Sequence, residues 1–310
     1  MTDLLDLSVV VADAIAHRQA IVALESTIIA HGMPWPQNVE TALALEDEIT
    51  RQGAVPATIA ILDGRLKVGL CRDEIKRIGG AGHRIAKVSR ADIPIVAAHG
   101  GSGATTVAAT MIIAALAGIR VFATGGIGGV HRGAATSFDI SADLHELARS
   151  PVAVVCAGVK SVLDIGLTLE YLETHGVPVI GYRTDRFPAF FSRDSGFGAG
   201  ARIDDADGIA RVMRAKWALG LTGGIVIANP IPVEFEMRHD LVDPAIERAL
   251  EEARAQAVTG KAVTPYLLRR VDALTGGDSV RSNVELVLSN ARLAARIAVA
   301  YHAIDGEGGD

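Results

Sequence analysis

Short apolar runs alternate along the chain with glycine-rich loops and longer amphipathic stretches. Short runs rich in Val and Ile are typical of strands buried in a parallel sheet. They predict strands at residues 20–24, 86–89, 93–97, 120–124, 152–156, 177–182 and 224–228. The Asp63-Gly64 pair between residues 58–62 and 65–69 favours the tight turn of a hairpin.

The longer stretches predict helices, at residues 8–18, 39–52, 107–116, 164–175, 209–219, 244–257, 266–275 and 282–300. Asn38 is placed to cap the helix at 39–52, and Ser161 to cap the first turn of the helix at 164–175. Nothing rich in Pro or Ser divides the chain. We therefore expect one α/β/α domain over residues 1–310, with flexible ends at about 1–7 and 304–310.

Composition supports this fold class. Hydrophobic residues make up 49% of the 310 residues and aromatic residues 4%, with 33 glycines. This mix suits alanine-rich helices packed on β-branched parallel strands joined by tight turns.

Charge and cysteine usage narrow the partners and the compartment. A formal net charge of −6 argues against a nucleic-acid scaffold. Acidic residues stand where a signal peptide would be positive, and the longest apolar run, about 107–117, is too short to span a bilayer. Cys71 and Cys156 form no CxxC pair and are typical of reduced thiols. We expect a soluble, cytoplasmic protein with no nucleic-acid or membrane partner.

Lys160 follows the apolar run 152–156 and precedes a predicted helix. It would lie at the carboxyl end of a strand, the edge where open α/β sheets bind ligands. A nearby helix N-terminus and a partly dry pocket both disfavour an ammonium, so Lys160 can become an amine nucleophile. On position alone, a solvated lysine in a strand–helix loop is the simpler alternative.

Glu25 ends the run 20–24 and precedes two hydroxyl residues. Burial there would raise its pKa toward the range useful for a general acid. The alternative is a glutamate that accepts local backbone hydrogen bonds.

The loop at residues 100–106 precedes a helix and offers backbone N–H groups and hydroxyls to an anion. It matches neither a Walker A loop nor a dinucleotide fingerprint. Either a phosphate cradle or an ordinary strand–helix turn fits it.

Oxygen ligands gather in the string 138–144. In an extended chain Asp139, Ser141 and Asp143 would project from one face and suit a hard cation or sugar hydroxyls. Ser141 or Asp143 could instead cap a helix that begins near residue 144, and both interpretations can hold together.

The sequence offers three further cationic candidates. Lys87, within an apolar string, is a candidate phosphate ligand or a strand-edge lysine, and His131 and Arg132 could add anion contacts. The histidines lack the paired spacing of a zinc site, and no GxSxG elbow is present.

Six strings together resemble the pseudouridine-5′-phosphate glycosidases, a family that includes the indigoidine-synthase-A-like proteins. They are residues 23–34 (ALESTIIAHGMP), 103–111 (GATTVAATM), 123–133 (ATGGIGGVHRG), 139–144 (DISADL), 155–161 (VCAGVKS) and 228–232 (ANPIP). The likeness runs from about residue 20 to about residue 300. The string 99–102 (HGGS) departs from the pattern expected of the family.

The resemblance implies a three-layer α/β/α fold around a central mixed, mostly parallel sheet, assembled as a homotrimer. The implied activity is reversible cleavage of pseudouridine 5′-phosphate to uracil and ribose 5-phosphate. Lys160 matches the covalent nucleophile, Glu25 the proton donor, and Asp139 the ligand of a divalent Mn²⁺. Substrate-binding positions are matched by Lys87, Val107, Ser141, Ala142 and Asp143, with further phosphosugar contacts expected at Thr124, His131 and Asn283. A pseudouridine kinase, fused in some relatives, would be a separate partner.

The chemistry fits these residues. The base is joined to ribose by a carbon–carbon bond, and a lysine bonded to C1′ supplies the electron sink that a carbon leaving group requires. Alternatives are another Schiff-base lyase or aldolase acting on a sugar phosphate, and a catalytically silent phosphosugar-binding protein.

Overall fold

The computed structural model describes residues 3–258 and 260–306, and its centre is a large mixed sheet. Within these residues the sheet has 11 strands, with the main order β1-β4-β3-β2-β7-β9-β13-β11-β12, while β6 joins β3 to β5. Their bounds are β1 (Leu5–Leu7), β2 (Ile21–Leu24), β3 (Val55–Leu62), β4 (Arg65–Val68), β5 (Ala86–Val88), β6 (Gly103–Thr105), β7 (Val121–Ala123), β9 (Ala153–Cys156), β11 (Val179–Tyr182), β12 (Ala201–Ile203) and β13 (Ile225–Ala228). A short antiparallel pair, β8 (Val130–His131) and β10 (Leu163–Asp164), lies beside it.

Most strand pairs are parallel. The central run from β3 through β2, β7, β9, β13 and β11 to β12 is parallel throughout, and β4 and β6 pair with β3 antiparallel. Every residue of β2, β9 and β13 is buried, as their unbroken apolar sequences require of strands covered on both faces. The predicted mixed, mostly parallel sheet is confirmed.

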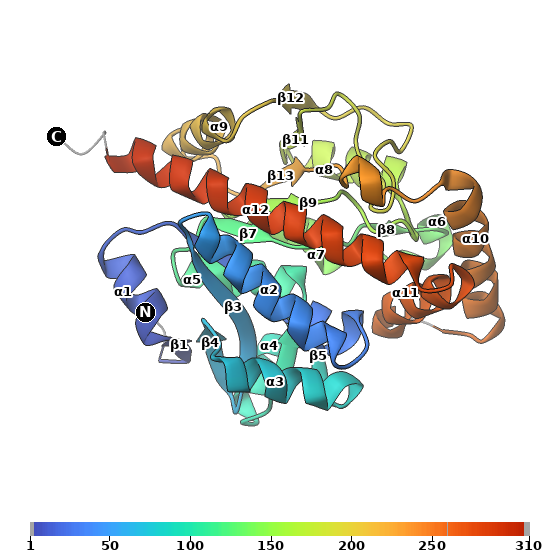
Figure 1. Ribbon diagram of the computed structural model, residues 1–310, viewed down its shortest axis with the longest axis horizontal. Coiled ribbons are helices and arrows are strands. Elements are labelled where there is room, and N and C mark those ends of the chain that lie inside the picture. Colours follow the sequence, from blue (N-terminus) through green and yellow to red (C-terminus); the bar gives the residue numbers. More distant parts are fainter. Residues whose placement is uncertain (1–2, 259, 307–310) are drawn as a thin grey trace.

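Helices cover both faces of this sheet, which gives three layers (Figure 1). The long helix α12 (Asp278–Gly306) crosses β2, β7 and β9 beside α2 (Gln37–Arg51), while α5 (Val107–Leu116) and α7 (Ala142–Leu147) lie behind the strands. The remaining helices are α1 (Val9–Ala16), α3 (Arg72–Ala81), α4 (Ile93–Ala98), α6 (Ala134–Ser137), α8 (Ile165–Thr174), α9 (Ala206–Ala218), α10 (His239–Ala255) and α11 (Val263–Leu274). Among the described residues, no helix combines the length and apolarity that crossing a membrane requires.

Some local predictions were wrong. The run 93–97 is helix α4, not a strand, because Pro94 fits a first helical turn and a Ser89–Asp92 capping box starts the turn before it. Asn38 does not cap α2, which begins at Gln37. Its buried amide donates instead to the carbonyls of Ile29 (2.6 Å) and Gly79 (3.2 Å).

The chain ends also differ from expectation. Leu5–Leu7, expected to be flexible, pair with β4, and α12 continues to Gly306. Residues 1–2 and 307–310 of the expected flexible ends lie outside the described residues. Helix α3 was not predicted; a capping box that joins Cys71 and Glu74 begins it.

Candidate active site

The candidate site lies where the direction of strand connection reverses. Strand β2 pairs with β3 on one side and with β7 on the other. In open α/β sheets such a reversal leaves a crevice at the carboxyl ends of the strands. Glu25 follows β2, Thr124 follows β7 and Lys160 lies four residues beyond β9, so all three lie at this edge. Glu25 and Lys160 line the cavities there, whereas the predicted substrate contact Thr124 is buried and lines neither.

Two adjoining cavities, here called cavity I and cavity II, open at this edge within the described residues, and Glu25, Thr27, Lys87, Lys160 and Thr264 line both of them. Cavity I has a volume of about 250 Å³. It brings together most of the residues predicted from the sequence: Glu25, Lys87, Val107, His131, Asp139, Ser141, Ala142, Asp143 and Lys160. Residues 99–102 line neither cavity; Gly101 and Ser102 bind the β3–β4 turn instead.

Glu25 is a buried carboxyl beside two lysines. Its exposed fraction is 8%, and Oε1 accepts a 2.5 Å hydrogen bond from Thr124 Oγ1. Burial is the largest influence and raises the pKa of Glu25, while Lys160, the Thr124 hydroxyl and Lys87 oppose the rise and Asp143 adds to it. The carboxyl is therefore suited to hold a proton that it can donate.

A buried amide cluster holds the strand end that carries Thr124. Asn290, on α12 and fully buried, donates from Nδ2 to the carbonyls of Thr124 (2.8 Å) and Gly125 (3.3 Å). Its Oδ1 accepts a 2.9 Å hydrogen bond from Nδ2 of Asn229, the residue that directly follows β13. Sequence reasoning missed this cluster because nothing in the helical pattern around residue 290 indicates that it faces two strand ends.

Lys160 is set by the loop that leaves β9. Its backbone N–H donates to the Ile127 carbonyl at 3.1 Å, which joins this loop to the glycine-rich loop after β7. Gly158 turns the chain with φ +90°, and a Cβ there would lie 2.2 Å from the Pro188 carbonyl oxygen. The lysine charge lowers the pKa of Glu25, so the amine and the carboxyl share one electrostatic environment.

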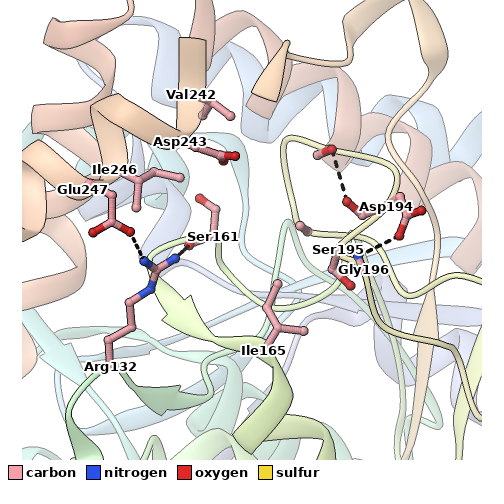
Figure 2. A pocket seen from close by; sticks show the side chains of 12 residues that line it. Arg132, Ser161, Ile165, Asp194, Ser195, Gly196, Val242, Asp243, Ile246 and Glu247 are labelled. Atoms are coloured by element: carbon pink, nitrogen blue, oxygen red, sulfur yellow. Dashed lines mark hydrogen bonds and ion pairs between the residues drawn. The ribbon is translucent and has the colours of Figure 1, made fainter. Parts of the chain in front are cut away.

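Ser161 and Arg132 line neither cavity I nor cavity II. Asp164, not Ser161, caps α8, accepting from Leu167 N at 2.9 Å. Figure 2 shows the Ser161 side chain pointing into a separate cavity, where Arg132 pairs with Glu247 of α10. Arg132 therefore lies outside cavities I and II, and its expected anion contact stays a prediction.

Asp143 joins the start of α5 to the glycine-rich loop. Its Oδ1 accepts from Ala108 N and its Oδ2 from Gly128 N, each at 2.8 Å. Ser141 caps α7 by accepting from Asp143 N at 3.2 Å. The helix-capping alternative is correct here, and the extended string with one shared face is not formed, although these residues still line cavity I.

The region expected to cradle phosphate is partly ordinary structure. Gly103–Thr105 form β6, and Thr106 caps α5 by accepting from Ala109 N at 3.4 Å. Because Asp143 already occupies Ala108 N, less of this helix N-terminus is left to bind an anion.

Asp139 and His131 lie at the rim of cavity I. The carboxylate side chain is 40% exposed, and its Oδ2 lies 3.7 Å from His131 Nδ1. Burial chiefly lowers the pKa of His131, Lys87 lowers it further, and Asp139 acts in the opposite direction. Among the described residues, no cluster of three or more His, Cys, Asp or Glu side chains could enclose a metal.

Cavity II has a more apolar wall. Phe190, Gly125 and Gly126 line it, together with Thr264, Pro265 and Leu268 from the region of α11. Asn283, expected beside the phosphosugar groups, lines this cavity and not cavity I, and its Oδ1 is buried without a hydrogen-bond partner. No sequence pattern marks Phe190 or Thr264 as lining residues.

A three-layer fold with a buried acid and a lysine in adjoining cavities at the edge of a parallel sheet is typical of α/β enzymes. The chain belongs to the family described as Indigoidine synthase A like protein, whose model matches residues 10–300.

Comparison with known proteins gives a closer relationship. The chain is 58% identical to a pseudouridine-5′-phosphate glycosidase of Hahella chejuensis, over 98% of this chain and 100% of that protein. It is 60% identical to the pseudouridine-5′-phosphate glycosidase of Escherichia coli K12, over 98% and 97%. Among solved structures, a prealnumycin C-glycosynthase in complex with ribulose 5-phosphate superimposes with a TM-score of 0.91, 41% identity and coverage of 99% and 100%.

Proposed function

We propose that this protein is a pseudouridine-5′-phosphate glycosidase, which reversibly cleaves the carbon–carbon glycosidic bond of pseudouridine 5′-phosphate to give uracil and ribose 5-phosphate. The observation that carries the proposal is the buried, proton-holding Glu25 next to Lys160 where cavities I and II adjoin. Full-length similarity to glycosidases of this specificity supports it.

In this proposal cavity I binds the ribose phosphate of the substrate and cavity II binds its base. Lys87, Thr106 and Ser141 give cavity I the charge and hydroxyls that suit a ribose phosphate. Cavity II offers the Phe190 ring and the amide of Asn283, which suit a flat polar base. A nucleotide lying across both cavities would place its glycosidic bond beside Glu25 and Lys160.

The proposed mechanism uses Lys160 to make a carbon leaving group possible. Glu25 donates its proton to the ribose ring oxygen, the ring opens, and Lys160 Nζ adds at C1′. Protonation of uracil at C5 then breaks the C1′–C5 bond and leaves an iminium between C1′ and Lys160. Water adds to this Schiff base and releases ribose 5-phosphate, which frees the amine.

We further propose that Asp139 binds a divalent Mn²⁺. One exposed carboxylate, with no enclosing cluster among the described residues, fits a hard cation that keeps most of its waters or takes phosphate oxygens. When bound, the ion would supply positive charge beside cavity I. Asp139 would hold it, and His131 lies beside that carboxylate.

The proposal extends to assembly and setting. We propose a homotrimer in the cytoplasm, with a separate pseudouridine kinase acting as its pathway partner. The exposed Leu167 and Phe197 in a groove between α8 and the β11–β12 edge support an interface between copies, and the free Cys71 and Cys156 support a reducing compartment. Light scattering tests the trimer, which Phe197→Glu would dissociate.

The activity is tested by assaying uracil released from pseudouridine 5′-phosphate in the presence of Mn²⁺. Wild type should release uracil, whereas Lys160→Ala should not, and borohydride should trap ribose 5-phosphate on Lys160 of the wild type. Uridine 5′-phosphate, which carries the same base on nitrogen, is the matched control substrate. Aldehyde release from a deoxysugar phosphate without uracil release would favour an aldolase, and binding without turnover a silent phosphosugar-binding protein.

A further inference from the structure

We propose that His31 recognises the nucleobase by donating a hydrogen bond from Nε2 to a uracil carbonyl, and that His83 and Arg269 set the tautomer required for this bond. This inference rests on the proposed function, because it names a specificity-determining residue of the same site.

A chain of hydrogen bonds fixes where the protons lie. Arg269 Nη1 is 2.9 Å from His83 Nε2, and an arginine can only donate, so this His83 nitrogen accepts. A neutral His83 then carries its proton on Nδ1, which lies 3.0 Å from His31 Nδ1. His31 Nδ1 therefore accepts, and the proton of a neutral His31 is on Nε2.

Both rings are held neutral. Burial is the main cause that lowers the pKa of His31 to about 4; His83, Lys87 and Arg269 add to the decrease, and the Ile85 carbonyl opposes it. The pKa of His83 is also lowered, by burial and by Arg269. With neither ring charged near neutral pH, the hydrogen-bond order Arg269 to His83 to His31 favours a proton on Nε2 of His31.

The donor so created belongs to cavity II. His31 lines this cavity, and its Nε2 is buried without a hydrogen-bond partner among the described residues. Asn283, in the same cavity, has a buried Oδ1 that also lacks a partner. An unsatisfied donor and an unsatisfied acceptor in one cavity are both costly without a ligand, so they indicate one that carries both complementary groups.

The imide of uracil carries these groups, since its carbonyls accept and its ring N–H groups donate. A base with an amino group in place of the carbonyl would set a donor against His31 Nε2–H. His31 would thus select for the carbonyl-bearing pyrimidine and against an amino-bearing one.

The same helix that lines cavity II also sets the tautomer. Arg269 lies on α11, near Thr264, Pro265 and Leu268, which form part of the cavity wall. Placement of this helix over the site and orientation of the base-recognising donor are therefore coupled through His83.

The tautomers can be measured directly in the full chain by ¹⁵N NMR of the imidazole nitrogens near neutral pH. We expect a protonated Nε2 on His31 and a protonated Nδ1 on His83. Arg269→Leu should remove the preference and give mixed tautomers on both rings. A proton on Nδ1 of His31 in the wild type would overturn the proposal, and this readout does not depend on catalytic activity.

Base recognition is tested in the synthetic direction, from ribose 5-phosphate and uracil. His31→Leu should raise KM for uracil about tenfold, the usual size of one neutral hydrogen bond, while His31→Gln, which keeps a donor, should raise it less. Wild type should also prefer uracil over thiouracils, whose sulfur accepts weakly, and His31→Leu should lose that preference.

Equal effects of Leu and Gln, or an unchanged preference for uracil, would contradict the role of His31. Borohydride trapping of ribose 5-phosphate in each variant, which needs no base, normalises for folding. If wild type makes no pseudouridine 5′-phosphate at all, the proposed function fails, whereas the tautomers measured by NMR stand or fall separately.

Discussion

The hydroxyl of Thr124 donates to the carboxyl of Glu25 at 2.5 Å, which links the ends of the neighbouring strands β7 and β2. This hydrogen bond stabilises the ionised carboxyl, whereas burial, the stronger influence, stabilises the protonated form. Asn290 holds the Thr124 carbonyl from the other side. The proton affinity of Glu25 is thus set by a balance in which Thr124 limits the effect of burial.

Thr124→Val should raise the pKa of Glu25 further, because it removes a hydrogen bond to the ionised form. A proton donor loses activity when it ionises, so the basic limb of kcat/KM against pH should move to higher pH. Hydrogen bonds to an ionised group are stronger than those between neutral groups, so the loss of this one should move the limb measurably. The pH–rate profile for pseudouridine 5′-phosphate cleavage measures the shift.

Thr124→Ser is the matched control, because it keeps the hydroxyl and should leave the basic limb near its wild-type position. A movement of the limb to lower pH in Thr124→Val would show that the titrating group is not Glu25 in the role of an acid.

Glu25→Gln should lower activity and raise stability. General acid catalysis contributes about 10²–10⁴-fold, so kcat should fall by that order. Below the unfolded-state pKa, near 4.5, the carboxyl is protonated in both states and variant and wild type should be similarly stable. As the pH rises toward the raised folded-state pKa, wild type loses stability that the glutamine retains.

Thermal unfolding of wild type and of Glu25→Gln, measured from below pH 4.5 to neutral pH, tests this prediction. The difference in Tm should be small in acid and should grow in favour of Glu25→Gln toward neutral pH. A wild type that is more stable than the variant at neutral pH would mean that attraction to Lys160 and Lys87 outweighs the cost of burial.

The positions of Glu25 and Lys160 follow from the sequence, because the carboxyl ends of parallel strands meet at one edge of a sheet. The run 93–97 shows the limit of this reasoning. A short apolar stretch fits a strand or a buried helix equally well, and only Pro94 and the Ser89–Asp92 capping box favour the helix.

Asn290, His31 and Phe190 could not be assigned from the sequence, since their roles depend on which distant element each one meets. Asn290 lies 166 residues from the Thr124 carbonyl it binds, and His31 is 52 residues from His83. Periodicity places such residues on an element, but the partner is set by tertiary packing.

Asp143→Asn should destabilise the protein, because both carboxylate oxygens accept from backbone N–H groups. An amide can accept at one position and must set its own N–H against the other donor. We expect a loss of about 2 kcal/mol or more in the free energy of unfolding, together with reduced activity as the glycine-rich loop shifts. Denaturant unfolding measures the loss.

Ser141→Ala is the matched comparison. It removes the helix cap of α7 but leaves the two backbone N–H groups that donate to Asp143 satisfied, so it should lower the free energy of unfolding by about 1 kcal/mol. Equal losses for the two variants would indicate that Asp143 contributes no more than an ordinary helix cap.

Gly158→Ala should disturb Lys160 more than general stability explains. Gly158 has φ +90°, and an added Cβ would lie 2.2 Å from the Pro188 carbonyl oxygen, which is backbone and cannot turn aside. Gly118, with φ +79° and nothing within 4 Å of the added Cβ, isolates the conformational cost alone. Gly118→Ala should lose roughly 1–2 kcal/mol of unfolding free energy.

Gly158→Ala should lose more and should also form the borohydride-trapped adduct at least tenfold more slowly, because the loop that carries the amine must move. Similar adduct formation in the two variants would show that the close approach of Gly158 to Pro188 does not position Lys160.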